Sequence, residues 1–178
     1  MKTGGNYEDV PTGSYGAVCY KIIDIGTQES TFNNETKKRH QVIIGWELSE
    51  KMKDGKPFSI TKFYTLSLHE KATLRSHLEA WLKRPLTEAD CASFDPKSLL
   101  GKPFLVNVGL NKKGRSTVLG FASVPKGVEV PTPVNPTVYF DLESFDETVF
   151  NSLSDKLKDL IRKSPEYAEA IGSADIPL

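Results

Sequence analysis

The sequence is poor in cysteine: only Cys19 and Cys91 occur in 178 residues, and neither belongs to a C-x-x-C pair. This scarcity argues against a disulfide framework and against a zinc knuckle, and it indicates a reducing compartment such as the cytoplasm. The sequence also lacks any stretch of about 18 apolar residues, the length that a membrane-spanning helix needs. Its first residues have no apolar run of the signal-peptide type. We therefore expect a protein of the cytoplasm and not of a membrane.

Catalytic sequence motifs are missing as well. The chain has no G-x-x-x-x-G-K-S/T loop for phosphates, no G-x-G-x-x-G, no G-x-S-x-G and no H-E-x-x-H. His69 and His77 lie eight residues apart on a predicted helix, which is too far for them to share one metal ion. The sequence therefore predicts no enzymatic activity, no cofactor and no metal site.

The net charge is zero, because 23 Lys and Arg balance 23 Asp and Glu. Taken alone, this balance argues against a strongly basic nucleic-acid binder. Residues 1–130, however, carry 19 basic and 14 acidic residues, a net of +5, and residues 131–178 carry 4 and 9, a net of −5. A basic part followed by an acidic part favours nucleic-acid binding with an acidic tail, although chance gives the same excess. If the acidic part competes with DNA, removal of residues 131–178 should tighten binding.

Hydrophobic patterning predicts five strands and one helix in residues 1–130. Apolar and polar residues alternate in the strands, whereas leucines at three- and four-residue spacing mark the helix, with Ser67 and Glu70 as a capping box at its start. The polar segment 27–37, which contains Asn33 and Asn34, is interpreted as a loop. The expected strands are residues 15–25, 38–50, 58–67, 103–110 and 115–124, and the expected helix is residues 68–82.

The order of three strands, a helix and two strands is that of the OB-fold, a five-stranded Greek-key barrel. We therefore predict a mainly β fold in which residues 1–130 form an OB-fold domain that binds nucleic acid. Residues 131–178 are interpreted as a proline-rich connector, a short helix at 151–163 and an acidic C-terminal tail. Other small barrels share this order of elements.

Basic residues gather in two loops that flank the nucleic-acid groove of an OB-fold. One cluster lies where segment 27–37 enters the second strand, and the other lies in the turn between the fourth and fifth strands. Cations there would neutralise phosphates, although charged loops also serve solubility alone. The candidate phosphate-binding residues, one of them in the third strand, are Lys37, Lys38, Arg39, Lys62, Lys112, Lys113 and Arg115.

Three rings are candidates for stacking on bases, because every base presents a flat π-face that a ring can cover. Phe32 lies in the polar segment, and Trp46 and Tyr64 lie in the second and third strands. Trp46 shares its face with apolar residues, so a core position is the competing interpretation. On the opposite face of the third strand, Phe63 is a plausible outward ring, and strand periodicity does not tell which face points outward.

The last four residues, Asp175, Ile176, Pro177 and Leu178, resemble the Asp-Ile-Pro-Phe terminus of bacterial single-stranded DNA-binding proteins. In those proteins an acidic tail with an apolar end docks onto partner enzymes. The resemblance implies that the same four residues bind replication or recombination proteins here. Leu178 departs from the pattern, because it replaces the aromatic residue.

Longer motifs are spread over residues 10–167: Pro11-x-Gly-x-Tyr15, Trp46-Glu47, the run from Lys62 to Arg75, Leu78-x-x-Trp81, Phe94-Asp-x-x-x-Leu-Leu-Gly101-Lys-Pro and Ser164-Pro-Glu-Tyr167. Together they resemble a family of phage-encoded, replication-associated OB-fold proteins that bind single-stranded DNA. The resemblance implies a sequence-tolerant single-stranded DNA-binding protein that supports phage DNA replication or recombination in the cytoplasm of a bacterial host. The alternative is a protein-interaction adaptor of a phage or host replication complex, which would use the barrel and the C-terminal tail.

Overall fold

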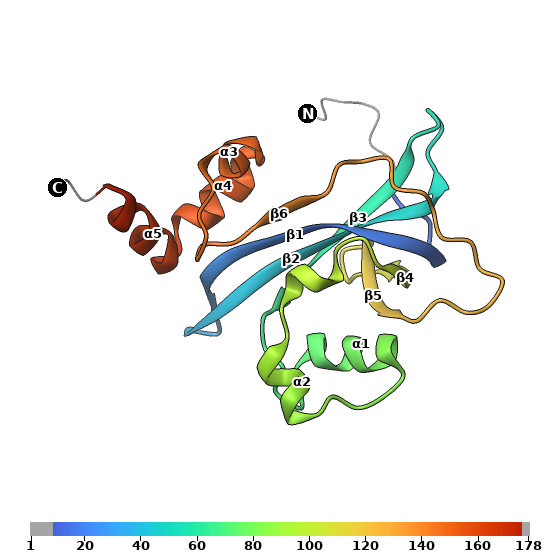
Figure 1. The fold of residues 1–178 in the computed structure, drawn as a ribbon, viewed down its shortest axis with the longest axis horizontal. Helices are drawn as coiled ribbons and strands as arrows, with labels where there is room; N and C mark the ends of the chain where they lie inside the picture. The colour runs from blue at the N-terminus through green and yellow to red at the C-terminus, as the bar shows by residue number, and fades with distance from the viewer. Residues whose placement is uncertain (1–8, 176–178) are drawn as a thin grey trace.

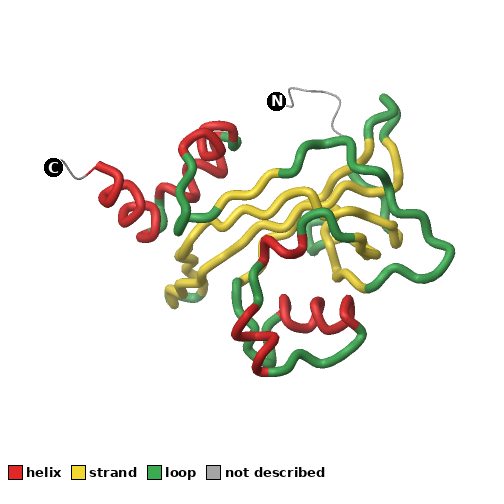
Figure 2. Tube along the Cα trace, in the orientation of Figure 1, coloured by secondary structure: helices red, strands yellow, loops and turns green. Residues whose placement is uncertain are grey.

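The computed structural model describes residues 9–175 and confirms a mainly β fold (Figure 1). The strands are β1 (Gly13–Phe32), β2 (Glu35–Lys51), β3 (Pro57–Thr65), β4 (Pro103–Leu110), β5 (Ser116–Ala122) and β6 (Val138–Phe140). The helices are α1 (Thr73–Leu82), α2 (Glu88–Ser93), the 3-10 helix η1 (Pro96–Leu99), α3 (Glu147–Ser152), α4 (Asp155–Arg162) and α5 (Pro165–Asp175). Figure 2 shows the helices in two groups, with α1 and α2 below the sheet and α3 to α5 at its left end.

The long strand β1 is the centre of the sheet. It pairs antiparallel with β2 along one edge, and at the other edge it pairs with β4 through residues 13–18 and parallel with β6 through residues 21–23. The hydrogen-bonded order is β3-β2-β1-β4-β5, with β6 beside β1. Because β3 and β5 stand at the two ends of this order and still contact each other, the sheet curves back on itself.

The interpretation of residues 27–37 as a loop is wrong. Residues 27–32 belong to β1 and residues 35–40 to β2, and they pair as a hairpin that we call the arm (residues 27–40). Asn33 and Asn34 form its two-residue turn with φ angles of 53° and 62°, a left-handed conformation that asparagine tolerates better than most residues. Across the arm, Thr31 Oγ1 lies 3.0 Å from Thr36 Oγ1.

Alternate residues of β2 point to opposite faces of the sheet. Its even-numbered residues from Val42 to Leu48 are buried in an inner core under α1 and η1. We call the opposite face, which carries the odd-numbered residues of β2, the outer face. By direct pairing with β2, the outer face also includes Ser59, Thr61, Phe63 and Thr65 of β3.

A second core covers one end of the outer face. Ile23, Ile25 and Ile43 of the sheet are buried there by residues of β6 and of the C-terminal helices. The predicted helix at 151–163 corresponds to the end of α3 and the whole of α4, and a further helix, α5, follows it. The expected acidic tail is wrong as far as Asp175, because α5 runs to that residue.

The start of α1 also differs from the prediction. The helix begins at Thr73, and its N-cap residue Ala72 makes no side-chain hydrogen bond. Ser67 Oγ instead accepts a hydrogen bond from the backbone N–H of His69 at 3.2 Å, within a loop. A complete capping box does occur, at Thr87 and Asp90 at the start of α2.

Candidate nucleic-acid interface

The outer face of β2 carries two of the predicted cations on the arm. Lys37 pairs with Ser30, and Arg39 pairs with Gln28 of β1. Both cations are exposed, and both share the outer face because their numbers differ by two. Lys38 lies between them and points to the other face of the arm, where its Nζ atom is 3.9 Å from Glu29 Oε2. The basic run is therefore divided between the two faces of the arm.

Two exposed rings share the outer face with Lys37 and Arg39. Phe32 stands opposite Glu35 at the tip of the arm, and 77% of its surface is exposed. Phe63 of β3 stands opposite Ile43, and 43% of its surface is exposed. Exposed rings beside cations on one sheet face provide the two contacts that single-stranded nucleic acid needs, stacking and phosphate neutralisation.

A further cation on the outer face, Lys21, is not among the site residues that the sequence predicts. It pairs with Gly45, where an added Cβ atom would lie 3.0 Å from Lys21 Cβ and 3.1 Å from Thr61 Cγ2. The side chain of Lys21 therefore crosses the sheet over Gly45, and its Nζ lies 5.5 Å from the centre of the Tyr20 ring. A glycine inside a strand often marks such a close approach, so Gly45 was the available signal.

The structure contradicts Trp46 and Tyr64 as stacking rings. Trp46 has no exposed surface and packs in the inner core, with ring centres 6.0 Å from Phe104 and 5.5 Å from Phe121. Tyr64 is 2% exposed, and its hydroxyl lies 2.7 Å from His77 Nδ1. Burial, which also raises the pKa of Tyr64, leaves no ring face for a base.

Lys62 does not lie on the outer face either. It shares the inner side of β3 with Tyr64, and its Nζ lies 5.7 Å from the centre of that ring. Its side chain is half-buried, and burial lowers the pKa of its ammonium group. Lys62 is thus separated from Phe63 by the sheet itself.

The two predicted basic clusters lie toward opposite ends of β1. Gly13 pairs with Val108, so the β4–β5 turn lies beyond the N-terminal end of β1, whereas the arm forms its C-terminal end. The part of β1 that lies between Gly13 and the arm is about 50 Å long, at about 3.3 Å per residue. Arg115 Nε lies 3.9 Å from Oδ1 of Asp9, a residue that precedes the N-terminal end of β1. The turn residues, all exposed, are Lys112, Lys113 and Arg115.

The connector after β5 covers the other end of the outer face. Glu47 is fully buried there, and its carboxylate accepts hydrogen bonds from the backbone N–H groups of Val134 at 2.8 Å and Asn135 at 2.9 Å. The side-chain amide of Asn135 adds a third at 2.8 Å. The free part of the outer face therefore extends from Gly45 along β3 and the arm.

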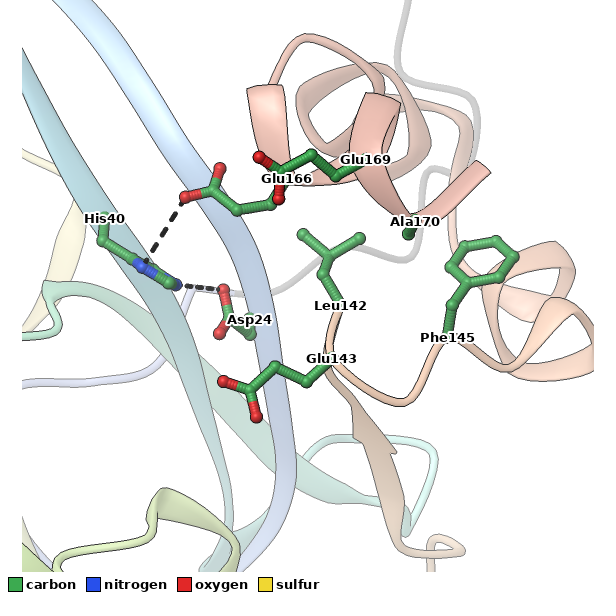
Figure 3. A pocket seen from close by; sticks show the side chains of 8 residues that line it. All are labelled: Asp24, His40, Leu142, Glu143, Phe145, Glu166, Glu169 and Ala170. Carbon is green, nitrogen blue, oxygen red and sulfur yellow. Dashed lines mark hydrogen bonds and ion pairs between the residues drawn. The ribbon is translucent and has the colours of Figure 1, made fainter. Parts of the chain in front are cut away.

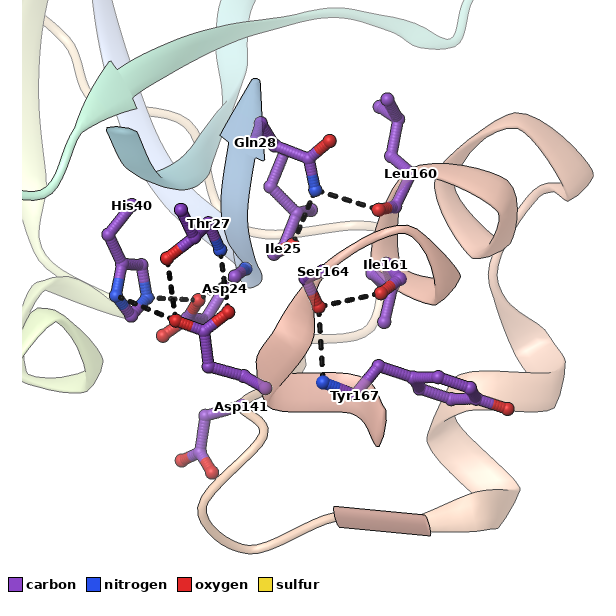
Figure 4. A network of polar contacts seen from close by, with 12 residues as sticks. Asp24, Ile25, Thr27, Gln28, His40, Asp141, Leu160, Ile161, Ser164 and Tyr167 are labelled. Atoms are coloured by element: carbon purple, nitrogen blue, oxygen red, sulfur yellow. Dashed lines mark hydrogen bonds and ion pairs between the residues drawn. The ribbon is translucent and has the colours of Figure 1, made fainter. Parts of the chain in front are cut away.

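The base of the arm is tied to α5. Glu166 accepts hydrogen bonds from the backbone N–H of Thr27 at 2.8 Å and from its hydroxyl at 2.6 Å. His40 Nε2 lies 2.6 Å from Asp24 Oδ1, and His40 Nδ1 lies 3.9 Å from Glu166 Oε2 (Figure 3). Gln28 Nε2 donates to the carbonyl oxygen of Leu160 in α4 at 2.7 Å (Figure 4). These contacts fix the direction in which the arm points.

The same contacts shift two pKa values. Its hydrogen bond to Asp24 raises the pKa of His40 above 6.5, outweighing burial, which acts in the opposite direction. Burial raises the pKa of Glu166, but the hydrogen bonds from Thr27 outweigh it and bring this pKa below 4.5. A protonated imidazole between two carboxylates is therefore favoured at this junction.

The predicted partner-binding tip is described only in part. Asp175 is the last residue of α5, and Ile176, Pro177 and Leu178 lie outside the described residues. Within residues 9–175, no group of three or more His, Cys, Asp or Glu side chains is placed to hold a metal ion. None of the helices in that range is both long and apolar enough to cross a membrane.

No family model matches the sequence, and no curated protein matches it.

Proposed function

We propose that this chain binds single-stranded DNA without sequence preference and supports phage DNA replication or recombination. One observation carries the proposal: a single sheet face holds two exposed rings, Phe32 and Phe63, together with the exposed cations Lys37 and Arg39. Cations neutralise phosphates and rings stack on any base, so the contact is indifferent to sequence. The proposed activity is binding alone and requires no cofactor.

The strand order supports the OB-fold as part of this proposal. The order β3-β2-β1-β4-β5, the contact between β3 and β5, and a helix between β3 and β4 all fit a partly open Greek-key barrel. In that fold, nucleic acid binds across β2 and β3, the strands that carry Arg39 and Phe63. Membership of the phage family and a bacterial cytoplasmic location belong to the same proposal and rest on the motif resemblance.

The proposal is tested by titrating the full chain into a labelled single-stranded oligonucleotide at two salt concentrations. We expect binding that weakens steeply with salt, because bound phosphates release counterions. Phe32→Ala and Phe63→Ala should each weaken binding by about 1–3 kcal/mol, the contribution of one stacked base.

Leu119→Ala is the matched control, because Leu119 is 60% exposed on β5, outside the proposed face. It should bind as the wild type does. Absence of binding at low salt, or binding that does not respond to salt, would overturn the proposal. Equal losses in all three variants would place the interface elsewhere.

A further inference from the structure

A second basic surface lies between the arm and the C-terminal helices. It is a cavity of about 660 Å³ at the junction where the base of the arm meets the end of α4 and the start of α5. Figure 4 shows Thr27, Gln28, Leu160 and Ser164, which line it, facing one another across this junction. Its charged lining residues are Glu29, Lys38, Arg162 and Lys163.

Three cations therefore face one carboxylate in this cavity. Lys38 comes from β2, and Arg162 and Lys163 come from the end of α4. Within residues 9–175, Lys163 has no carboxylate at ion-pair distance, and its side chain is exposed. The cavity has room for an anion and a net charge that favours one.

The carboxylates that already pair with two of these cations compete only weakly with an incoming anion. Lys38 Nζ is 3.9 Å from Glu29 Oε2, with most of both side chains exposed. Arg162 Nη1 is 3.2 Å from Asp159 Oδ1, and about half of the arginine side chain is exposed. Exposed pairs of this kind contribute little and are screened by salt. The guanidinium group also lies 5.3 Å from the centre of the Phe150 ring, which holds it in place.

The start of α5 contributes less to anion binding than these side chains do. The N–H of Tyr167 in its first turn already donates to Ser164 Oγ at 3.2 Å. The Oγ atom of Ser164 in turn donates to the carbonyl of Ile161 at 2.7 Å. The three cationic side chains are therefore the groups that remain available for an anion.

We propose that Lys38, Arg162 and Lys163 bind a phosphate of the DNA backbone, so that the strand continues from the outer face around the edge of the arm. This inference rests on the proposed function. Lys37 and Arg39 point to the outer face while Lys38 points to the opposite one, so the arm presents cations on both sides. The C-terminal segment would then supply part of the DNA-binding surface, in spite of its net charge of −5.

The test compares single-stranded DNA binding of full-length Lys163→Ala, of Arg162→Gln and of the double variant over a series of salt concentrations. Loss of this one phosphate contact in the double variant should lower the slope of log K against log salt by about 0.7, and each single variant should show part of that decrease. Lys156→Ala is the matched control, because Lys156 is an exposed lysine of the same helix and does not line the cavity. It should keep the wild-type slope.

A wild-type slope in the double variant, with binding intact, would overturn this inference and leave the proposed function standing. Absence of salt-dependent binding by the wild type itself would instead overturn the proposed function. Thermal unfolding of each variant checks the fold, since Arg162 also packs on Phe150. If Arg162→Gln unfolds, Lys163→Ala alone decides, because Lys163 is exposed and ends α4 without such a contact.

Discussion

His40 links three parts of the molecule through one imidazole ring. It belongs to β2, its Nε2 contacts Asp24 of β1, and its Nδ1 lies near Glu166 of α5 (Figure 3). Glu143, on the segment after β6, adds a further negative charge that raises the pKa of His40. The ring therefore contributes most to the docking of the arm on α5 when it is protonated.

The stability of this junction should depend on pH on both sides of a maximum. Since folding raises the pKa of His40, its contribution is complete below pH 6.5 and is lost as the pH rises through the folded value. Since folding lowers the pKa of Glu166, its contribution is present above pH 4.5 and is lost as the pH falls through the folded value. We expect the highest melting temperature between these limits.

His40→Gln isolates the basic side of this profile. The variant should lose the decrease in melting temperature that the wild type shows above pH 6.5, and the two proteins should converge at high pH. His69→Gln is the control, because His69 is exposed in the loop before α1 and should leave the profile unchanged. Parallel profiles for wild type and His40→Gln would contradict a protonated His40 in the folded state.

Single residues show how far periodicity carries a prediction. Alternation along β2 correctly grouped Trp46 with Val42, Ile44 and Leu48. It did not tell whether that face stacks on DNA bases or is buried in the core. The deciding element was α1, which lies over the inner side and buries Tyr64 beside His77. Packing against a distant helix has no signature in the sequence of the strand, so periodicity alone does not tell whether Phe63, on the other face, points outward.

The arm is stabilised by its turn more than by burial. Its residues from Glu29 to Arg39 are exposed, so few apolar contacts hold the two strands together. The sequence of residues 27–37 predicts a loop because both strands there are polar and no period-2 hydrophobic signal marks them. The Asn33-Asn34 pair by itself indicates a loop, whereas two left-handed residues in succession are what a two-residue hairpin turn requires.

Changing this turn should loosen the arm and spare the rest of the fold. Asn33→Ala with Asn34→Ala places two alanines in the left-handed region, which costs about 1–2 kcal/mol per residue. We expect faster hydrogen exchange of the backbone N–H groups of Phe32 and Glu35, which flank the two-residue turn as a hydrogen-bonded pair. The melting temperature of the sheet should change little, because neither core formed by residues 9–175 includes the tip of the arm.

Asn34→Gly is the matched control for the turn, since glycine adopts a positive φ at no steric cost. It should retain or increase the protection of the Phe32 and Glu35 N–H groups. If the double alanine variant exchanged as slowly as the wild type, the positive φ angles would not be what limits the arm. Single-stranded DNA binding should weaken in the double alanine variant, because a mobile arm no longer holds Phe32 beside the outer face.

Residues 131–178 are integral to the molecule, although their composition suggested a connector and a detachable tail. Proline content and net charge reflect the polar, solvent-facing residues of this segment. They do not predict whether its apolar residues are buried. Phe140, Phe150 and Ile161 are buried in the second core against Ile23 and Ile43. The available signal in the sequence was the consecutive pair Ile22 and Ile23, whose side chains point to opposite faces of β1. A strand that is apolar on both faces needs a cover on each face.

Removal of residues 131–178 should therefore destabilise the chain and fail to tighten DNA binding. It would expose Ile23, Ile25 and Ile43, and burying an isoleucine is worth about 1.5–3 kcal/mol. The summed loss approaches the 5–15 kcal/mol that typically separates a folded from an unfolded domain. Urea unfolding of residues 1–130 beside the full chain measures the loss, and we expect a lower midpoint together with aggregation.

Phe140→Ala in the full chain tests the same contact without removing any charge. It opens the second core and should cost about 3–5 kcal/mol, while the acidic residues all remain. If residues 1–130 folded with the stability of the full chain and bound DNA more tightly, the C-terminal segment would act as an acidic competitor, as its net charge suggests. If the deletion of residues 131–178 and Phe140→Ala both lower the stability, the C-terminal segment is part of the folded molecule. Its apolar residues then cover the sheet and its cations border the arm, whatever its net charge.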